Sequence, residues 1–106
     1  MKDYSKTKIY IIKHIFDLDG KNSYIGSTTN WTVRFYQHKR RCNDPTDRGY
    51  NFKLYKFVRK FGGFQNFIMQ KIEDFPCKNK KESSTRERFW IEKYNSKLNM
   101  QKPSEL

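Results

Sequence analysis

The sequence predicts an α+β fold in which a three-stranded antiparallel β-sheet is flanked by helices. Segments rich in β-branched and aromatic residues alternate with segments whose apolar residues recur at helical spacing. A turn-forming cluster at residues 17–22 joins the first two strand-like segments and is typical of a hairpin. The chain has 106 residues and shows neither a linker nor an internal repeat, so we expect a single domain over residues 1–106, with its core at about 7–100.

The three strands are indicated by their β-branched and aromatic residues. The first, residues 7–16, carries paired isoleucines and two aromatic side chains. Residues 23–27 resume this character after the turn and form the hairpin partner. Residues 64–75 supply the third strand, which Pro76 ends because proline cannot donate to a strand ladder.

The hairpin turn decides whether Tyr10 and Tyr24 lie on the same face of the sheet. A two-residue turn would place them on opposite faces, because successive strand side chains alternate. We predict instead a three-residue loop over residues 18–20, with Gly20 in the left-handed conformation. This register, or another of odd loop length, puts both phenol rings on one face, with Tyr24 opposite His14 in the three-residue case.

Apolar residues at helical spacing predict three helices. The first is capped by Thr29 or Asn30 and ends near Cys42. The second spans residues 54–61 and is ended by a pair of glycines, and the last spans residues 79–94. The helices therefore supply the layers that cover the sheet.

The positive charge of the chain predicts a polyanionic partner. Lys and Arg number 23 against 11 Asp and Glu, which gives a formal net charge of +12. Because the excess is spread over several segments, a basic surface is expected, and nucleic acid is the usual partner of such a surface. A charge that serves only solubility is the alternative.

Cysteine usage and hydropathy bear on the location of the protein. Cys42 and Cys77 fit neither a metal-ligand spacing nor a disulfide framework, which favours an intracellular, reduced protein. No apolar run approaches the ~18 residues of a membrane span, and the N-terminus lacks the apolar region of a signal peptide. We therefore expect neither membrane insertion nor secretion.

Glu87 occupies an unusual position in the last predicted helix. It lies in an apolar stripe that continues with Trp90, Ile91 and Tyr94. A carboxylate on the core side of a helix is costly unless a cation, a metal or hydrogen bonds compensate it. Two interpretations are open: Glu87 binds a metal ion, or it pairs with an arginine such as Arg34 and only holds the fold together.

Residues in a fixed order along the chain resemble the signature of the GIY-YIG nuclease family. Lys8-Ile9-Tyr10 lies on the first strand, and Tyr24-Ile25-Gly26-Ser27-Thr28 forms the second. The resemblance extends to about residue 100 and includes Arg34, His38, Glu87 and Asn99. Lys8 replaces the glycine of the first motif, and the interval between the two motifs is longer than is typical of the family.

This resemblance implies a metal-dependent endonuclease that hydrolyses DNA phosphodiester bonds. Glu87 would be the protein ligand of Mg²⁺ or Mn²⁺, and Arg34 would stabilise charge in the transition state. Tyr24 is the preferred general base, and Tyr10 and His38 are the alternatives. Asn99 would position its neighbours. The implied catalytic set is thus Tyr10, Tyr24, Arg34, His38, Glu87 and Asn99.

Basic residues around this set are expected to bind DNA. Target choice would come from the loop at residues 43–50, from the basic second helix, from a partner chain or from a homodimer. Two rival hypotheses are a catalytically inactive nucleic-acid-binding module, suggested by Lys8 and by the high basic charge, and a structural protein that docks on RNA. The candidate nucleic-acid-binding residues are Lys8, Arg34, Lys39, Arg41, Lys53, Lys56 and Arg59.

Overall fold

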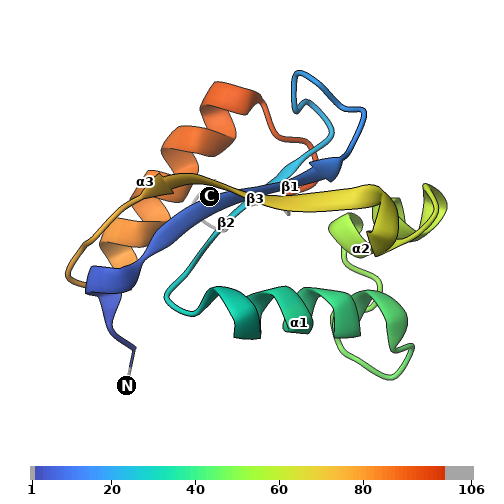
Figure 1. Cartoon of the computed structure of the whole chain (residues 1–106), viewed down its shortest axis with the longest axis horizontal. Helices are drawn as coiled ribbons and strands as arrows, with labels where there is room; N and C mark the ends of the chain where they lie inside the picture. Colours follow the sequence, from blue (N-terminus) through green and yellow to red (C-terminus); the bar gives the residue numbers. More distant parts are fainter. Residues whose placement is uncertain (1, 100–106) are drawn as a thin grey trace, which may run out of the picture.

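The computed structural model describes residues 2–99, which form an α+β fold (Figure 1). The strands pair antiparallel in the order β2-β1-β3, so the predicted fold class is confirmed. Met100, the last residue of the expected core, lies outside the described residues. The elements in chain order are a 3₁₀ turn (Tyr4–Lys6), β1 (Lys8–His14), β2 (Tyr24–Thr28), α1 (Trp31–Asn43), α2 (Lys53–Lys60), a second 3₁₀ turn (Phe64–Asn66), β3 (Phe67–Asp74) and α3 (Lys80–Tyr94).

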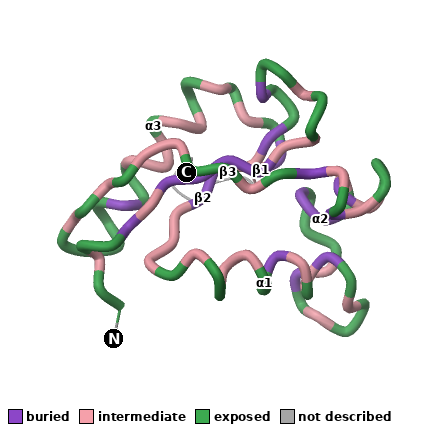
Figure 2. The backbone as a smooth tube through the Cα atoms, in the orientation of Figure 1, coloured by how far each residue is buried: buried purple, intermediate pink, exposed green. Residues whose placement is uncertain are grey.

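The sheet separates two hydrophobic clusters. Successive side chains of β1 alternate between its faces, so Tyr10 and Ile12 pack with α1 and α2 while Ile9 and Ile11 pack with α3. Figure 1 shows α3 on one side of the sheet and α1 and α2 on the other. The central strand β1 is thereby buried on both faces, which explains its continuous apolar run (Figure 2).

The hairpin register confirms the shared face of the two tyrosines but not the three-residue loop. Tyr10 pairs with Gly26 and Ile12 pairs with Tyr24, and the phenol ring centroids lie 6.3 Å apart on one face. The prediction that Tyr24 would lie opposite His14 was wrong, because β1 and β2 are joined by a much longer loop. Gly20 does adopt the predicted left-handed conformation, with φ of 71°.

Hydrogen bonds within the long loop and from a distant segment both stabilise it. The Asp17 carboxylate accepts hydrogen bonds from the backbone N–H groups of Gly20 and Asn22, at 3.2 and 3.1 Å. The chain after α3 then returns to this loop, and the Leu98 N–H donates to the Ser23 carbonyl at 2.9 Å. A segment distant in sequence therefore sets the width of the hairpin.

The element ends follow local hydrogen bonding. Asn30 caps α1 by accepting from Val33 N–H at 3.2 Å, as one of the two predicted caps. β1 ends at His14, two residues earlier than predicted, because the His14 ring accepts from the Phe16 N–H and starts a turn. β3 begins at Phe67 rather than Phe64, because a 3₁₀ turn precedes it. No helix in the described part of the chain is long and apolar enough to cross a bilayer.

Candidate active site

A cleft of about 430 Å³ opens beside the edge strand β2. It lies between the first half of α1 and the first half of α3, and the chain around the N-terminal 3₁₀ turn closes one end. Three of the six residues in the expected catalytic set line it: Tyr24, Arg34 and Glu87. The structure therefore brings together a phenol, a guanidinium and a carboxylate from three different elements.

The position of β2 at the sheet edge explains how α1 and α3 contribute to one cleft. The two helices cover opposite faces of the sheet, and they can meet only around an edge. Side chains of β2 alternate accordingly, with Tyr24 directed to the α1 face and Ser27 to the α3 face. The edge strand thus contributes to the cleft from both of its faces.

Glu87 lies on the inward side of α3, as the sequence predicted. Its Oε2 accepts a hydrogen bond from the Ser27 hydroxyl. Among residues 2–99 no ion pair joins Glu87 to Arg34, so the structure does not support the interpretation that this pair holds the fold together. Burial raises the pKa of Glu87, and the Ser27 hydrogen bond and the charges of Arg34 and Lys80 oppose that shift.

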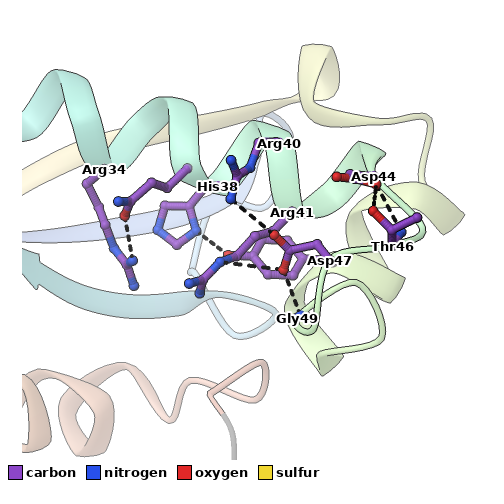
Figure 3. A network of polar contacts seen from close by, with 10 residues as sticks. Arg34, His38, Arg40, Arg41, Asp44, Thr46, Asp47 and Gly49 are labelled. Carbon is purple, nitrogen blue, oxygen red and sulfur yellow. Dashed lines mark hydrogen bonds and ion pairs between the residues drawn. The ribbon is translucent and has the colours of Figure 1, made fainter.

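Arg34 is held at the mouth of the cleft by two hydrogen bonds. Its Nε donates to the Tyr10 hydroxyl at 3.3 Å, and its Nη1 donates to Gln37 Oε1 at 3.1 Å. The side chain is half-buried, and it projects from the first half of α1 (Figure 3). A guanidinium fixed in this way presents its remaining donors to the cleft.

Tyr10 and His38 lie behind the cleft and do not line it. They are 0% and 1% exposed, and the Tyr10 hydroxyl lies 2.7 Å from His38 Nε2. His38 Nδ1 lies 2.6 Å from the Tyr55 hydroxyl on α2. Burial and the nearby charges of Arg34 and Arg41 lower the pKa of His38 to about 3. His38 is therefore neutral at physiological pH, which argues against the role of proton carrier.

Lowering the pH from 7 to 5 should destabilise the protein through His38. Its folded pKa of about 3 lies below the ordinary value of ~6.5, so near pH 5 the unfolded chain binds a proton that the folded chain does not. This contribution to stability is present above pH ~6.5 and is lost as the pH falls toward 3. We expect a loss of about 2 kcal/mol at pH 5, measured by urea unfolding. An unchanged pH dependence in His38→Gln would contradict this expectation.

Asn99 pairs with the backbone of β2 rather than lining the cleft. Its Oδ1 accepts from the Ile25 N–H at 2.9 Å, and its Nδ2 donates to the Ile25 carbonyl at 2.8 Å. The amide thereby occupies the outer edge of β2, where a fourth strand would otherwise pair. Asn99 is placed to hold the edge strand in position.

The candidate DNA-binding residues other than Arg34 lie outside the cleft. Lys8 forms an ion pair with Asp74 on β3 at 3.0 Å. Arg41 points to Asp47, at 3.8 Å, in the loop after α1 (Figure 3). Arg59 stacks 3.6 Å from the Tyr50 ring centroid and donates to two backbone carbonyls of the same region.

The remaining candidates are lysines on the outer surfaces of the helices. Lys39 lies 5.6 Å from the Phe35 ring centroid on α1, and Lys53 and Lys56 are exposed on α2. The lysines that do line the cleft are Lys2 and Lys80, and neither was predicted from the sequence. Neither belongs to a recognisable motif, so only the tertiary arrangement reveals them.

Gly26 and Ser27 belong to the motif on the second strand, but neither was predicted to have a catalytic or binding role. Ser27 lies on the opposite face of β2 from Tyr24 and donates a hydrogen bond to Glu87. The alternation of strand side chains is compatible with this contact but does not predict it. Gly26 lies opposite Tyr10, and a Cβ atom at Gly26 would come within 2.5 Å of the Tyr10 hydroxyl oxygen. The missing side chain at Gly26 therefore leaves the space on β2 that the Tyr10 ring occupies.

Gly26→Ala should destabilise the fold and displace Tyr10. The added methyl group would overlap a fully buried phenol, and such overpacking costs about 1–3 kcal/mol. Urea unfolding measures the loss. Gly49→Ala is the matched control, because its Cβ would meet the more exposed Phe52 ring, at 3.0 Å, which has room to move. Equal stability of Gly26→Ala and the wild type would refute this account of the site.

Comparison with known proteins identifies a matching family. The family model of the GIY-YIG catalytic domain matches residues 6–100 of the 106-residue chain. A search of curated proteins and a search of solved structures each return no match. The matched range contains β1, β2, β3 and the three helices, together with the cleft residues Tyr24, Arg34 and Glu87.

Proposed function

This chain belongs to the GIY-YIG family, and from that premise we propose that it is a metal-dependent endonuclease that hydrolyses DNA phosphodiester bonds. A nuclease-type function follows from the family itself. The observation that carries the finer proposal is the convergence of Tyr24, Arg34 and Glu87 on one cleft. Phosphodiester hydrolysis needs an attacking water, compensation of negative charge and protonation of the leaving oxygen.

Glu87 is the proposed ligand of a divalent cation, Mg²⁺ or Mn²⁺. The residues around it fit a hard cation, because Ser27, Thr28, Ser83 and Ser84 add hydroxyl oxygens to the same cleft. In the described part of the chain no group of three or more His, Cys, Asp or Glu side chains forms a closed metal site. A single carboxylate implies weak binding that the substrate phosphate would complete. When bound, the cation would offset charge on the phosphate and make nearby water more acidic.

Arg34 is the proposed stabiliser of charge that develops on the phosphate. Its position is fixed before substrate arrives by the hydrogen bonds to Tyr10 and Gln37. Lys2 and Lys80 line the same cleft and supply further positive charge for the neighbouring phosphates. The lysines on the outer surfaces of α1 and α2 are proposed to contact more distant parts of the DNA.

Tyr24 is the proposed proton acceptor for the attacking water. Of the three candidates for this role, Tyr24 lines the cleft, while Tyr10 and His38 lie behind it. Burial raises the pKa of Tyr24, and the Arg34 guanidinium opposes that shift by favouring the phenolate. Arg34 therefore serves both the phosphate and the phenol, since its charge lies next to each.

The rival hypothesis of an inactive binding module rested on Lys8 and on the high positive charge of the chain. In the structure, the Lys8 ammonium pairs with Asp74 on β3, which lies at the opposite edge of the sheet from β2. Lys8 is not among the residues that line the cleft. Replacement of the motif glycine therefore leaves the cleft open, which favours the enzyme over the binding module.

A plasmid assay tests the proposal. Supercoiled DNA incubated with the protein should be nicked in Mg²⁺ or Mn²⁺ and stay intact with a chelator. Salt-sensitive DNA binding without nicking in either metal would instead indicate the binding module. Preferential, metal-independent binding to RNA would indicate the structural protein. A panel of linear, branched and nicked duplexes, with the oligomeric state measured alongside, would then show how targets are chosen.

A further inference from the structure

Tyr55 is a buried polar residue to which the proposed reaction gives no role. It comes from α2, is 2% exposed, and places its hydroxyl 2.6 Å from His38 Nδ1. The contacts continue from His38 Nε2 to the Tyr10 hydroxyl at 2.7 Å, and from there to Arg34 Nε at 3.3 Å. Four side chains from α2, α1 and β1 thus form one hydrogen-bonded chain that ends at the cleft.

The direction of each bond follows once the hydrogen of the fully buried Tyr10 hydroxyl is paired. Arg34 can only donate, so the Tyr10 oxygen accepts from it. Tyr10 still has its own hydrogen to donate, and within residues 2–99 its other hydrogen-bond partner is His38 Nε2. His38 therefore accepts at Nε2. A neutral imidazole that accepts at Nε2 carries its hydrogen on Nδ1, so Nδ1 donates to Tyr55.

We propose that Tyr55 is a positioning residue of the nuclease, which holds His38 in the Nδ1–H tautomer and through it orients Tyr10 and Arg34. The proposal rests on the proposed function, because it concerns the guanidinium that would contact the phosphate. The Tyr55 hydroxyl is the acceptor that makes this tautomer favourable, and the tautomer in turn makes Tyr10 a donor to His38.

The other tautomer would make His38 and Arg34 both donate to the Tyr10 oxygen. With the hydrogen on Nε2, Tyr10 would have to accept from both His38 and Arg34, and its own hydrogen would lose its partner in a buried place. Without the Tyr55 hydroxyl, each tautomer leaves one buried donor unpaired. The second contact of Arg34, to Gln37, is exposed and cannot replace the buried anchor.

Nitrogen NMR of His38 tests the hydrogen-bonded chain without any substrate. In the wild type we expect the two ring nitrogens to show one protonated and one unprotonated signal, with the hydrogen on Nδ1. Tyr55→Phe should change this pattern, because it removes the hydroxyl that accepts from Nδ1. The same hydroxyl also accepts from Arg41. A wild-type His38 with its hydrogen on Nε2 would overturn the proposal, whether or not the variant folds.

Nicking kinetics test the effect of the chain on the reaction. Tyr55→Phe should lower kcat by about 10- to 100-fold with KM changed less than about twofold, because DNA still binds while Arg34 is no longer held in place. Tyr94→Phe is the matched control, since it removes a tyrosine hydroxyl on the opposite face of the sheet. We expect its kcat to equal that of the wild type.

The outcomes separate this proposal from the proposed function. Wild-type kcat in Tyr55→Phe, or an equal fall in Tyr94→Phe, would overturn the positioning role while the nuclease stands. A wild type that nicks no DNA would overturn the nuclease and the catalytic part of this proposal together. The hydrogen-bonded chain itself is then still judged by the His38 spectra.

Discussion

Glu87→Gln should abolish DNA nicking while leaving DNA binding intact. Glutamine keeps the shape of the side chain and an oxygen to accept from the Ser27 hydroxyl, so the fold and the cleft should persist. It removes the negative charge that would hold the divalent cation, and loss of that cation should lower kcat by on the order of 10³-fold, about 4 kcal/mol. Single-turnover nicking of supercoiled plasmid measures the change.

The control for this substitution lies on the same helix. Glu92→Gln removes a carboxylate from an exposed position of α3 that does not line the cleft, and it should nick at the wild-type rate. A gel-shift titration should give the same DNA affinity for Glu87→Gln and the wild type in chelator. Wild-type nicking by Glu87→Gln would show that the cation, if used, is held elsewhere.

Arg34→Lys should lower kcat by about 10²- to 10³-fold even though the positive charge is kept. Lysine lacks the planar set of donors, so it cannot hydrogen-bond Tyr10 and present further donors to the cleft at fixed angles. DNA affinity should change little, because the total charge of the protein is unchanged.

Arg40→Lys provides the comparison on the same helix. Arg40 is exposed on α1 and pairs at 3.5 Å with Asp47, outside the cleft. Its replacement should leave kcat and KM unchanged. Equal nicking by Arg34→Lys and Arg40→Lys would mean that positive charge alone matters at position 34, and the proposed role of the guanidinium geometry would be wrong.

Strand and helix periods were sufficient to predict the fold class, the shared face of the two tyrosines and the inward position of Glu87. Alternation along the strands placed Tyr10 and Tyr24 on one face, which the register confirms. The apolar stripe of α3 placed Glu87 on the inward side, where it meets Ser27. These features are local, because each depends on the repeat of a single element.

The burial of each site residue could not be predicted from the repeats of single strands and helices. Tyr10 and Tyr24 share a face, but Tyr10 lies on the central strand and is fully buried, whereas Tyr24 lies on the edge strand and reaches the cleft. Strand order is a property of the whole sheet, so no pattern within β1 or β2 contains it. For the same reason, the expected catalytic set divides into residues that line the cleft and residues that support them from behind.

Long-range docking accounts for the remaining differences. The hairpin loop was expected to be short because its turn residues suit a tight turn, but the observed loop is longer and the chain after α3 hydrogen-bonds to it. Tyr55 reaches His38 from α2 for the same kind of reason. Lys80 stands at the start of α3 and joins the cleft only because α3 lies against β2.

Paramagnetic NMR with Mn²⁺ tests most directly whether Glu87 holds a cation next to Tyr24 and Arg34. In the presence of a short DNA duplex, Mn²⁺ should broaden the backbone signals of Tyr24, Ser27, Arg34 and Glu87 and leave those of Lys53 and Lys56 sharp. Glu87→Gln should lose this broadening. Equal broadening in Glu87→Gln, or broadening centred away from the cleft, would contradict the proposed site.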